Sequence, residues 1–340
     1  MTIVDFLVDL AVDPQALARF RFDPEAAMAE AGLPEAEREA VIEGRPWPWV
    51  VHPPLFKGYG INLPHGEDEG SVLPLTGKPL DKRGLTIVGL GIRALQTSAE
   101  ARVCIAQASK VLYLVADPVS ERFVLQLNSN AESLADFYQP QKPRLQIYDE
   151  IVLKILACLE QTADLCVVFY GHPGVLSYPT RKALRIACEK GFGARMLPAT
   201  SALDNLIADL GIDPSGLQSF EATAFLIFKY PFATSAGLVL WQIDVLGETV
   251  WDPSHAAVRG RLKLLADYLA DFYGPVHEVY LYRAAVLPAA RREIECLSLS
   301  DLPRAKQIDG TTMYVPPKGL PEPDLDMARK LGVDIRSANA

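Results

Sequence analysis

"GLTIVGLGIRA", residues 84–94, contains the strongest local signal for the fold of this chain. Its apolar run Leu85–Leu90 predicts a buried strand, the glycines that follow predict a tight turn, and a helix is expected over Ser98–Ala108. The glycine spacing fits G-x-G-x-x-A, a weak form of the dinucleotide-binding fingerprint, and an acidic residue, Asp117, follows a second strand, somewhat late for that fingerprint. Any strand-to-helix turn can carry such glycines, so the pattern predicts a fold and selects no ligand.

Apolar strands and helices alternate along the following chain. The strands of this part are expected within residues 84–90, 110–118, 164–175 and 194–198. A helix over Tyr178–Lys190 separates the last two. This alternation predicts a mainly parallel sheet with helices on both faces. From about residue 200, strands within 237–243 and 277–283 and a helix within 256–274 predict a second α/β lobe.

Composition and charge exclude several classes of function. The chain has 340 residues, a net charge of -9 and 49% hydrophobic residues, which describes a globular protein and argues against binding nucleic acid. No apolar run reaches the length of a membrane span, and the N-terminus lacks the basic start of a signal peptide. The five cysteines show no C-x-x-C spacing. We therefore expect reduced thiols, no metal site, no membrane contact and a cytoplasmic location.

Residues 1–44 predict a small all-helical unit. Asp13 and Asp23 each precede a proline, which is the N-cap plus N1 arrangement that starts helices, and a third helix follows Pro34. This unit is either a helical cap or dimerisation bundle, or a recognition domain that docks on the larger region. Residues 45–83 are rich in proline and predict an extended linker.

"FYGHPGV", residues 169–175, is the most distinctive motif. It ends a buried strand with two glycines and a proline, and so presents backbone N–H and C=O groups at the carboxyl edge of the sheet. Ligands of open α/β sheets bind at that edge. Taken alone, His172 fits an ordinary loop histidine as well as a ligand contact.

Four motifs together carry a resemblance to a known family. They are "LTIVGLGI", "VLYLVADP", "FYGHPGV" and "ARMLPATSALDNLIADLGIDP", in this order. They resemble the tetrapyrrole-methylase superfamily of S-adenosylmethionine-dependent methyltransferases, and within it most closely the borosin peptide α-N-methyltransferases. The resemblance covers about residues 84–333. It implies a two-lobed class III α/β methyltransferase, with lobes at about 84–198 and 199–333 and a tail at 334–340.

Two positions depart from these relatives. Porphyrin-methylating members have a G-P-G element in the first glycine turn, whereas this chain has Gly89-Leu90-Gly91-Ile92, which counts against a tetrapyrrole substrate. Ala199 stands where borosin enzymes usually have glycine.

The resemblance also implies which residues form the site. Tyr138, Arg144 and Tyr148 match the tyrosine–arginine–tyrosine set that borosin enzymes use on the peptide. Either tyrosine, assisted by Arg144, would remove or polarise the amide proton. S-adenosylmethionine, with S-adenosylhomocysteine as product, is expected to contact Gly89, Gly91, Tyr170, Gly171, His172, Val175, Thr200, Ser201, Ala202 and Gln242. Methyl transfer needs no metal.

The N-terminal unit resembles the borosin-binding domain, the leader that holds a precursor peptide to its methyltransferase. A leader followed by an apolar, proline-rich stretch predicts that part of residues 46–80 is the enzyme's own substrate. Trp49, Val50 and Val51 are the candidate methylated residues, because proline has no N–H. A homodimer would let one subunit feed the other. The alternatives are that the stretch only fastens the helical unit, that the substrate is a separate precursor or a small molecule, or that the chain is an inactive peptide-binding protein.

Overall fold

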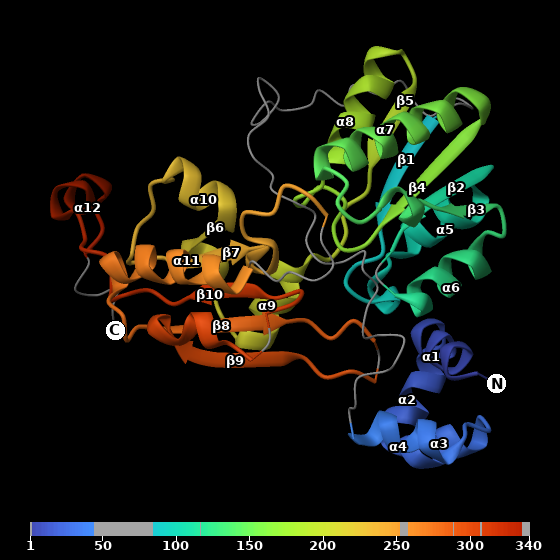
Figure 1. Cartoon of the computed structure of the whole chain (residues 1–340), viewed down its shortest axis with the longest axis horizontal. Helices are drawn as coiled ribbons and strands as arrows, with labels where there is room; N and C mark the ends of the chain where they lie inside the picture. Colours follow the sequence, from blue (N-terminus) through green and yellow to red (C-terminus); the bar gives the residue numbers. More distant parts are fainter. Residues whose placement is uncertain are drawn as a thin grey trace.

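The computed structural model describes residues 2–43, 84–115, 117–251, 258–287, 289–306 and 308–334. Two α/β lobes and a small helical unit make up this part of the chain (Figure 1). The expected linker and the candidate substrate within residues 46–80 lie outside the described residues, as does nearly all of the tail.

The first lobe is built on a parallel five-stranded sheet in the order β3-β2-β4-β1-β5. Its strands are β1 (Gly84–Gly89), β2 (Lys110–Leu114), β3 (Ala131–Ser133), β4 (Asp164–Phe169) and β5 (Gly193–Met196). Its helices are α5 (Ala99–Gln107), α6 (Pro118–Leu127), α7 (Arg144–Gln161) and α8 (Tyr178–Glu189). The predicted strand after residue 84 and the predicted helices at 98–108 and 178–190 are confirmed.

Both faces of this sheet are covered, which explains the continuous apolar runs of its strands. Ile87 and Val167 belong to the cluster that α7 and α8 complete on one face. Their neighbours Val88 and Val168 belong to the cluster that α5 and α6 complete on the other. Successive side chains of a strand point to opposite faces, so every position of a strand that is covered on both faces favours an apolar residue.

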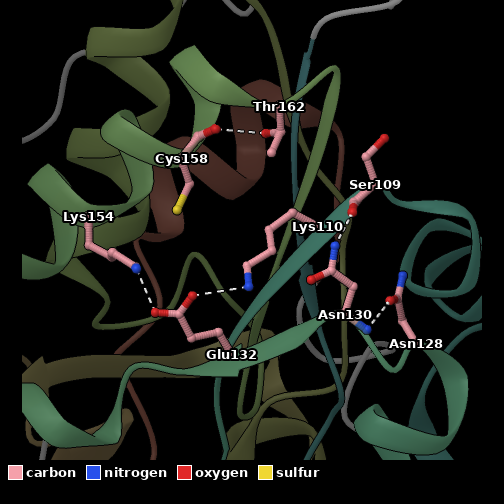
Figure 2. A network of polar contacts seen from close by, with 8 residues as sticks. All are labelled: Ser109, Lys110, Asn128, Asn130, Glu132, Lys154, Cys158 and Thr162. Atoms are coloured by element: carbon pink, nitrogen blue, oxygen red, sulfur yellow. Dashed lines mark hydrogen bonds and ion pairs between the residues drawn. The ribbon is translucent and has the colours of Figure 1, made fainter.

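Polar contacts hold the short edge strand β3 in place (Figure 2). Glu132 of β3 bonds to Lys110 on β2 at 3.0 Å and to Lys154 on α7 at 2.5 Å. These lysines, Lys154 first, lower the pKa of Glu132. Asn130 donates to the Ser109 carbonyl at 2.6 Å. Helix α7 is thereby tied to the edge of the sheet.

The second lobe has a mixed sheet in the order β6-β7-β10-β8-β9, in which only β6 and β7 run parallel. Its strands are β6 (Leu217–Glu221), β7 (Gly237–Trp241), β8 (Glu278–Arg283), β9 (Glu293–Ser298) and β10 (Thr312–Val315). Its helices are α9 (Ala202–Leu210), α10 (Ala222–Phe228), α11 (Val258–Tyr273) and α12 (Leu325–Leu331). Helices α10 and α11 complete the apolar cluster on one face, and Leu206 of α9 packs on Val239 and Tyr282 on the other.

The N-terminal unit contains α1 (Ile3–Val12), α2 (Pro14–Phe22), α3 (Pro24–Glu30) and α4 (Glu35–Glu43). Asp13 accepts a hydrogen bond from the Gln15 N–H at 2.8 Å, and Asp23 accepts one from the Ala26 N–H at 2.9 Å. The predicted Asp-Pro helix starts are therefore confirmed.

The helical unit touches both lobes. Helix α1 packs against α6 of the first lobe (Figure 1). The apolar cluster formed by the N-terminal helices also includes Val119 at the start of α6 and Leu287 in the β8–β9 connection of the second lobe. The unit is therefore fixed at the junction between the lobes. None of the helices in the described part of the chain is long and apolar enough to cross a membrane.

Candidate functional site

The two glycine turns of the sequence meet at the carboxyl edge of the first sheet. Gly91 and Gly171 have left-handed backbone angles, φ +75° and +65°, which favour glycine. The Gly171 N–H donates to the Gly91 carbonyl at 2.9 Å, and the Gly91 N–H donates back at 3.4 Å. A Cβ on Gly89 would lie 2.1 Å from the Gly171 oxygen, so only glycine fits there.

The next cofactor candidates lie against this edge. A Cβ on Gly89 would also lie 2.7 Å from the Ala199 Cβ, so Ala199 is accommodated because residue 89 has no side chain. Ser201 is the N-cap of α9: its N–H and Oγ each donate to an Asp204 carboxylate oxygen at 2.6 Å. Thr200 and Ala202 flank this cap and are set in place by it.

His172 is held by its own turn. Its Nδ1 accepts a hydrogen bond from the Gly174 N–H at 3.0 Å, and its carbonyl accepts one from Val175 at 3.0 Å. Because Nδ1 is used as an acceptor, Nε2 is the ring atom left to meet a ligand. His172 therefore stabilises its own turn through Nδ1 and can contact a ligand through Nε2.

Asp117, the acidic residue that a dinucleotide site would require, is occupied by its own helix. Its carboxylate accepts bonds from the Val119 and Ser120 N–H groups at 2.9 Å and from the Ser120 hydroxyl at 2.7 Å. Burial raises the pKa of Asp117, and these bonds oppose the rise. Burial, followed by the charge of Asp117, raises the pKa of Tyr170. This arrangement caps α6 and argues against a ribose contact.

Arg144 lies buried where the two lobes meet. It is the first residue of α7, is 2% exposed, and pairs with Glu248 at 3.3 Å between Nη2 and Oε2. Its backbone N–H donates to the Thr249 carbonyl at 3.0 Å. Beside it, Pro143 and Val250 form an isolated antiparallel bridge. The loop before α7 is thus paired, main chain to main chain, with a second-lobe segment.

The two candidate tyrosines, Tyr138 and Tyr148, are buried in one apolar cluster. Tyr138 meets the ring of Trp251 edge to face, with 6.3 Å between centroids. Tyr148, one helical turn beyond Arg144, lies with its ring centroid 6.1 Å from that of Tyr178. Tyr148 therefore lies on the same side of α7 as Arg144, and Tyr138 belongs to the same apolar cluster as Tyr148.

Gln242 is the predicted cofactor contact that follows strand β7 of the second lobe. It is 9% exposed and has a left-handed backbone with φ +60°. A non-glycine residue in this conformation needs support from its surroundings, and such positions concentrate at functional sites.

The family profile described as Tetrapyrrole (Corrin/Porphyrin) Methylases matches residues 84–294, which span the strands of the first sheet and much of the second. The chain belongs to the tetrapyrrole methylase family. Solved structures agree in fold. A cobalt precorrin-4 methyltransferase has a TM-score of 0.51 at 12% identity, covering 70% of this chain and 97% of that one. A conserved hypothetical protein from Aeropyrum pernix K1 has a TM-score of 0.50 at 15% identity, covering 75% and 91%.

Within the tetrapyrrole methylases, curated relatives confirm the resemblance to borosin enzymes, since two that are 38% and 36% identical to this chain are named borosin cyclic peptide precursors. The methyltransferase/ribosomally synthesized cyclic peptide gymnopeptides precursor of Gymnopus fusipes is 40% identical over 255 residues, covering 73% of this chain and 60% of the relative. The corresponding omphalotin A precursor of Omphalotus olearius is 38% identical over 255 residues, covering 73% and 61%. The match thus spans about three fifths of the length of these relatives.

Three partners of the candidate site residues were not predicted from the sequence. Glu248, Trp251 and Tyr178 contact Arg144, Tyr138 and Tyr148, respectively. Tyr178 in turn accepts a hydrogen bond from Lys182 at 2.7 Å, and Lys182 also pairs with Asp149. No local pattern marks these partners, because Glu248 is 104 positions from Arg144.

A cavity of about 790 Å³ adjoins the methylase's glycine turn. It is bounded by the residues after that turn, one face of α9, and the β8–β9 connection. Of the predicted cofactor contacts it includes Thr200, and it includes none of the three candidate catalytic residues. In the described residues, no group of three His, Cys, Asp or Glu side chains could hold a metal ion.

Proposed function

We propose that this chain transfers methyl groups from S-adenosylmethionine to backbone amide nitrogens of a ribosomally made peptide. The observation that carries the proposal is the burial of Arg144 together with Tyr138 and Tyr148 where the lobes meet, exposed by 2%, 8% and 4%. Buried arginine beside buried phenols is costly as mere packing and is suited to acid–base chemistry on a neutral substrate.

The chemistry requires a base and an oxyanion partner. A peptide N–H is a very weak acid because its nitrogen lone pair is delocalised into the carbonyl. Tyr148 or Tyr138 removes or polarises that proton, since the Arg144 guanidinium favours the ionised phenol. Arg144 and the other tyrosine then stabilise the charge that develops on the carbonyl oxygen.

Glu248 sets how strongly Arg144 can act. In the ion pair, part of the guanidinium charge is balanced by the carboxylate, which weakens its pull on a phenolate. The pair also fixes the direction of the guanidinium. Glu248 is thus a positioning residue for Arg144.

The residues at the carboxyl edge fit S-adenosylmethionine. The turns at Gly91 and Gly171 let a ligand approach the backbone, and His172 Nε2 and the Gln242 amide add polar contacts. Bound there, the cofactor would supply a methyl group activated by a sulfonium, and S-adenosylhomocysteine would be the product. Gly89, Tyr170, Val175, Thr200, Ser201 and Ala202 complete the expected contacts.

The proposed substrate is the chain's own segment within residues 46–80, with Trp49, Val50 and Val51 as acceptors. The relatives' names support this, because each describes a methyltransferase and a peptide precursor as one protein. We expect a cytoplasmic homodimer in which one subunit methylates the other. A separate precursor peptide, or a small molecule with the helical unit serving assembly, is the alternative.

Intact-mass spectrometry after incubation with S-adenosylmethionine tests the proposal. Added methyl groups that fragmentation assigns to residues 46–80 are the expected result. A chain that binds the cofactor and stays unmethylated, but methylates an added precursor peptide, would favour the alternative. Methylation of neither would contradict the proposed function. Size-exclusion chromatography with light scattering measures the expected dimer.

A further inference from the structure

The cavity beside the glycine turn is lined by more guanidinium groups than carboxylates. Three arginines line it: Arg93 just after the turn, and Arg291 and Arg292 on the β8–β9 connection. Two aspartates on α9, Asp204 and Asp209, also face it.

Both of these carboxylates already have partners. Asp204 accepts two bonds from Ser201 as part of the helix cap. Asp209 accepts the Tyr282 hydroxyl at 2.7 Å and pairs with Arg292 at 3.7 Å. Within the described residues neither Arg93 nor Arg291 forms an ion pair with an acid. The wall therefore has a net formal charge of +1, and in the described residues two of its three guanidinium groups are not paired with an acid.

Of the two arginines without an acid partner, Arg93 gives the stronger evidence for a bound ligand. Its Nε is buried and has no hydrogen-bond partner in the part of the chain that the structure describes. A buried N–H donor on a charged group costs free energy unless an acceptor meets it. Carboxylates match a guanidinium best, because they accept two parallel hydrogen bonds and balance its charge.

We propose that this cavity binds a carboxylate-bearing segment of the peptide substrate. The inference rests on the proposed peptide methyltransferase function and adds a recognition element to it. The chain itself offers such a segment: "HGEDEG", residues 65–70, has three acidic residues within the candidate substrate stretch and outside the described residues. A separate precursor with acidic residues is the other source of the same chemistry.

The helical unit is placed against a wall of this cavity. Ala290 of the β8–β9 connection lines the cavity and also packs on the apolar cluster of the N-terminal helices. Leu287, in the same connection, is buried in that cluster. The unit that precedes residues 46–80 in the chain is thus fixed beside the proposed binding site.

Fluorescence anisotropy without S-adenosylmethionine tests the inference independently of methyl transfer. The probe is a labelled peptide with the sequence of residues 62–73, compared with a copy in which Glu67, Asp68 and Glu69 are replaced by their amides. The protein is the full chain carrying Glu67→Gln, Asp68→Asn and Glu69→Gln, which removes competition from its own carboxylates. We expect the acidic peptide to bind at least about tenfold more tightly than the amide copy.

Arginine variants of the same chain locate the binding. Arg93→Gln with Arg291→Gln should reduce the affinity for the acidic peptide to that of the amide copy. Arg291→Gln alone, at an exposed position, should lower it several-fold and covers the case in which Arg93→Gln fails to fold. Arg304→Gln, at an exposed arginine paired with Asp301 outside the cavity, should change nothing.

Equal affinity for the two peptides, or undiminished binding by the double variant, would overturn the inference. Weaker binding of the acidic peptide to the unmodified chain than to the triple variant would identify residues 67–69 as the natural occupant. Equal binding to both chains would identify a separate peptide. Arginine-dependent binding without any methylation would count against the proposed function and leave the carboxylate site standing.

Discussion

Arg144 and Glu248 form a buried ion pair, 3.3 Å between Nη2 and Oε2, that joins the start of α7 to the second lobe. The side chains are 3% and 6% exposed. The backbone of Arg144 is tied to the same second-lobe segment through the Thr249 carbonyl. The candidate catalytic arginine is therefore positioned by contacts between lobes as well as by its own helix.

Glu248→Gln should lower the free energy of unfolding by about 3 kcal/mol, because it removes the carboxylate charge that is paired with the buried Arg144 guanidinium. Urea denaturation measures this change. Glu189→Gln, which removes an exposed partner of Arg185, is the matched control and should cost less than about 0.5 kcal/mol. Equal costs for the two variants would mean that the buried pair carries no special weight.

Tyr148→Phe should abolish methylation while cofactor binding, measured by calorimetry, is retained. The substitution removes the hydroxyl but keeps the ring that packs near Tyr178. Tyr268→Phe on α11, in an aromatic cluster of the second lobe, should leave the rate unchanged. Full activity of Tyr148→Phe would exclude a phenolic role there and transfer the expectation to Tyr138→Phe.

Gly89→Ala should abolish cofactor binding and lower the free energy of unfolding by about 2 kcal/mol or more. The added Cβ would lie 2.1 Å from the Gly171 oxygen, so the two glycine turns must separate. Ala199→Gly should rescue it only in part, because it relieves the 2.7 Å contact with Ala199 and leaves the one with the backbone.

Gly260→Ala is the control for this substitution. Residue 260 lies on the exposed side of α11, with nothing within 4 Å of an added Cβ. Alanine should therefore stabilise the protein by about 0.5 to 1 kcal/mol, as expected for a helix interior. Thermal denaturation of both variants gives the comparison.

Asp117→Asn should change how stability depends on pH. Burial raises the pKa of Asp117 in the folded protein above its ordinary value of 3.8, and Glu121 adds to the rise. The folded state then binds more protons than the unfolded state, so this group makes stability fall as pH rises from 3.8 through the raised pKa. The asparagine variant lacks this loss.

Urea denaturation from about pH 4 to about pH 7 measures the effect. The free energy of unfolding of Asp117→Asn, minus that of the unmodified protein, should increase with pH across this range. Asparagine keeps the oxygen that caps α6, so loss of the cap does not obscure the result. Parallel curves for the two proteins would show that Asp117 titrates as an ordinary exposed carboxyl.

Much of the first lobe was predictable because its signals are local. The apolar runs of β1 and β4 are continuous since both faces of the sheet are covered, and Gly89 and Gly91 mark the turn that follows β1. Asp13 and Asp23 cap helices that begin at the next residue. Each of these patterns depends on atoms only a few residues apart.

The edge strand β3 and the partners of the candidate site were not predictable in this way. Glu132 holds β3 in place through ion pairs with lysines of β2 and α7. The sequence of β3 shows no alternation of apolar and polar residues. Trp251 meets Tyr138 across more than a hundred positions of chain. Contacts of this kind follow from which loops the packing brings together.

From the sequence alone came the main strands of the first sheet except β3, the glycine turns, the Asp-Pro helix starts and the resemblance to a family. Those features follow from local sterics, hydrogen bonding and the spacing of apolar residues. That Glu248 pairs with Arg144, and that Arg93 and Arg291 line one cavity, depends instead on contacts between distant parts of the chain. The charge balance of a buried group depends on its neighbours in space, and folding brings those neighbours together from separate lobes.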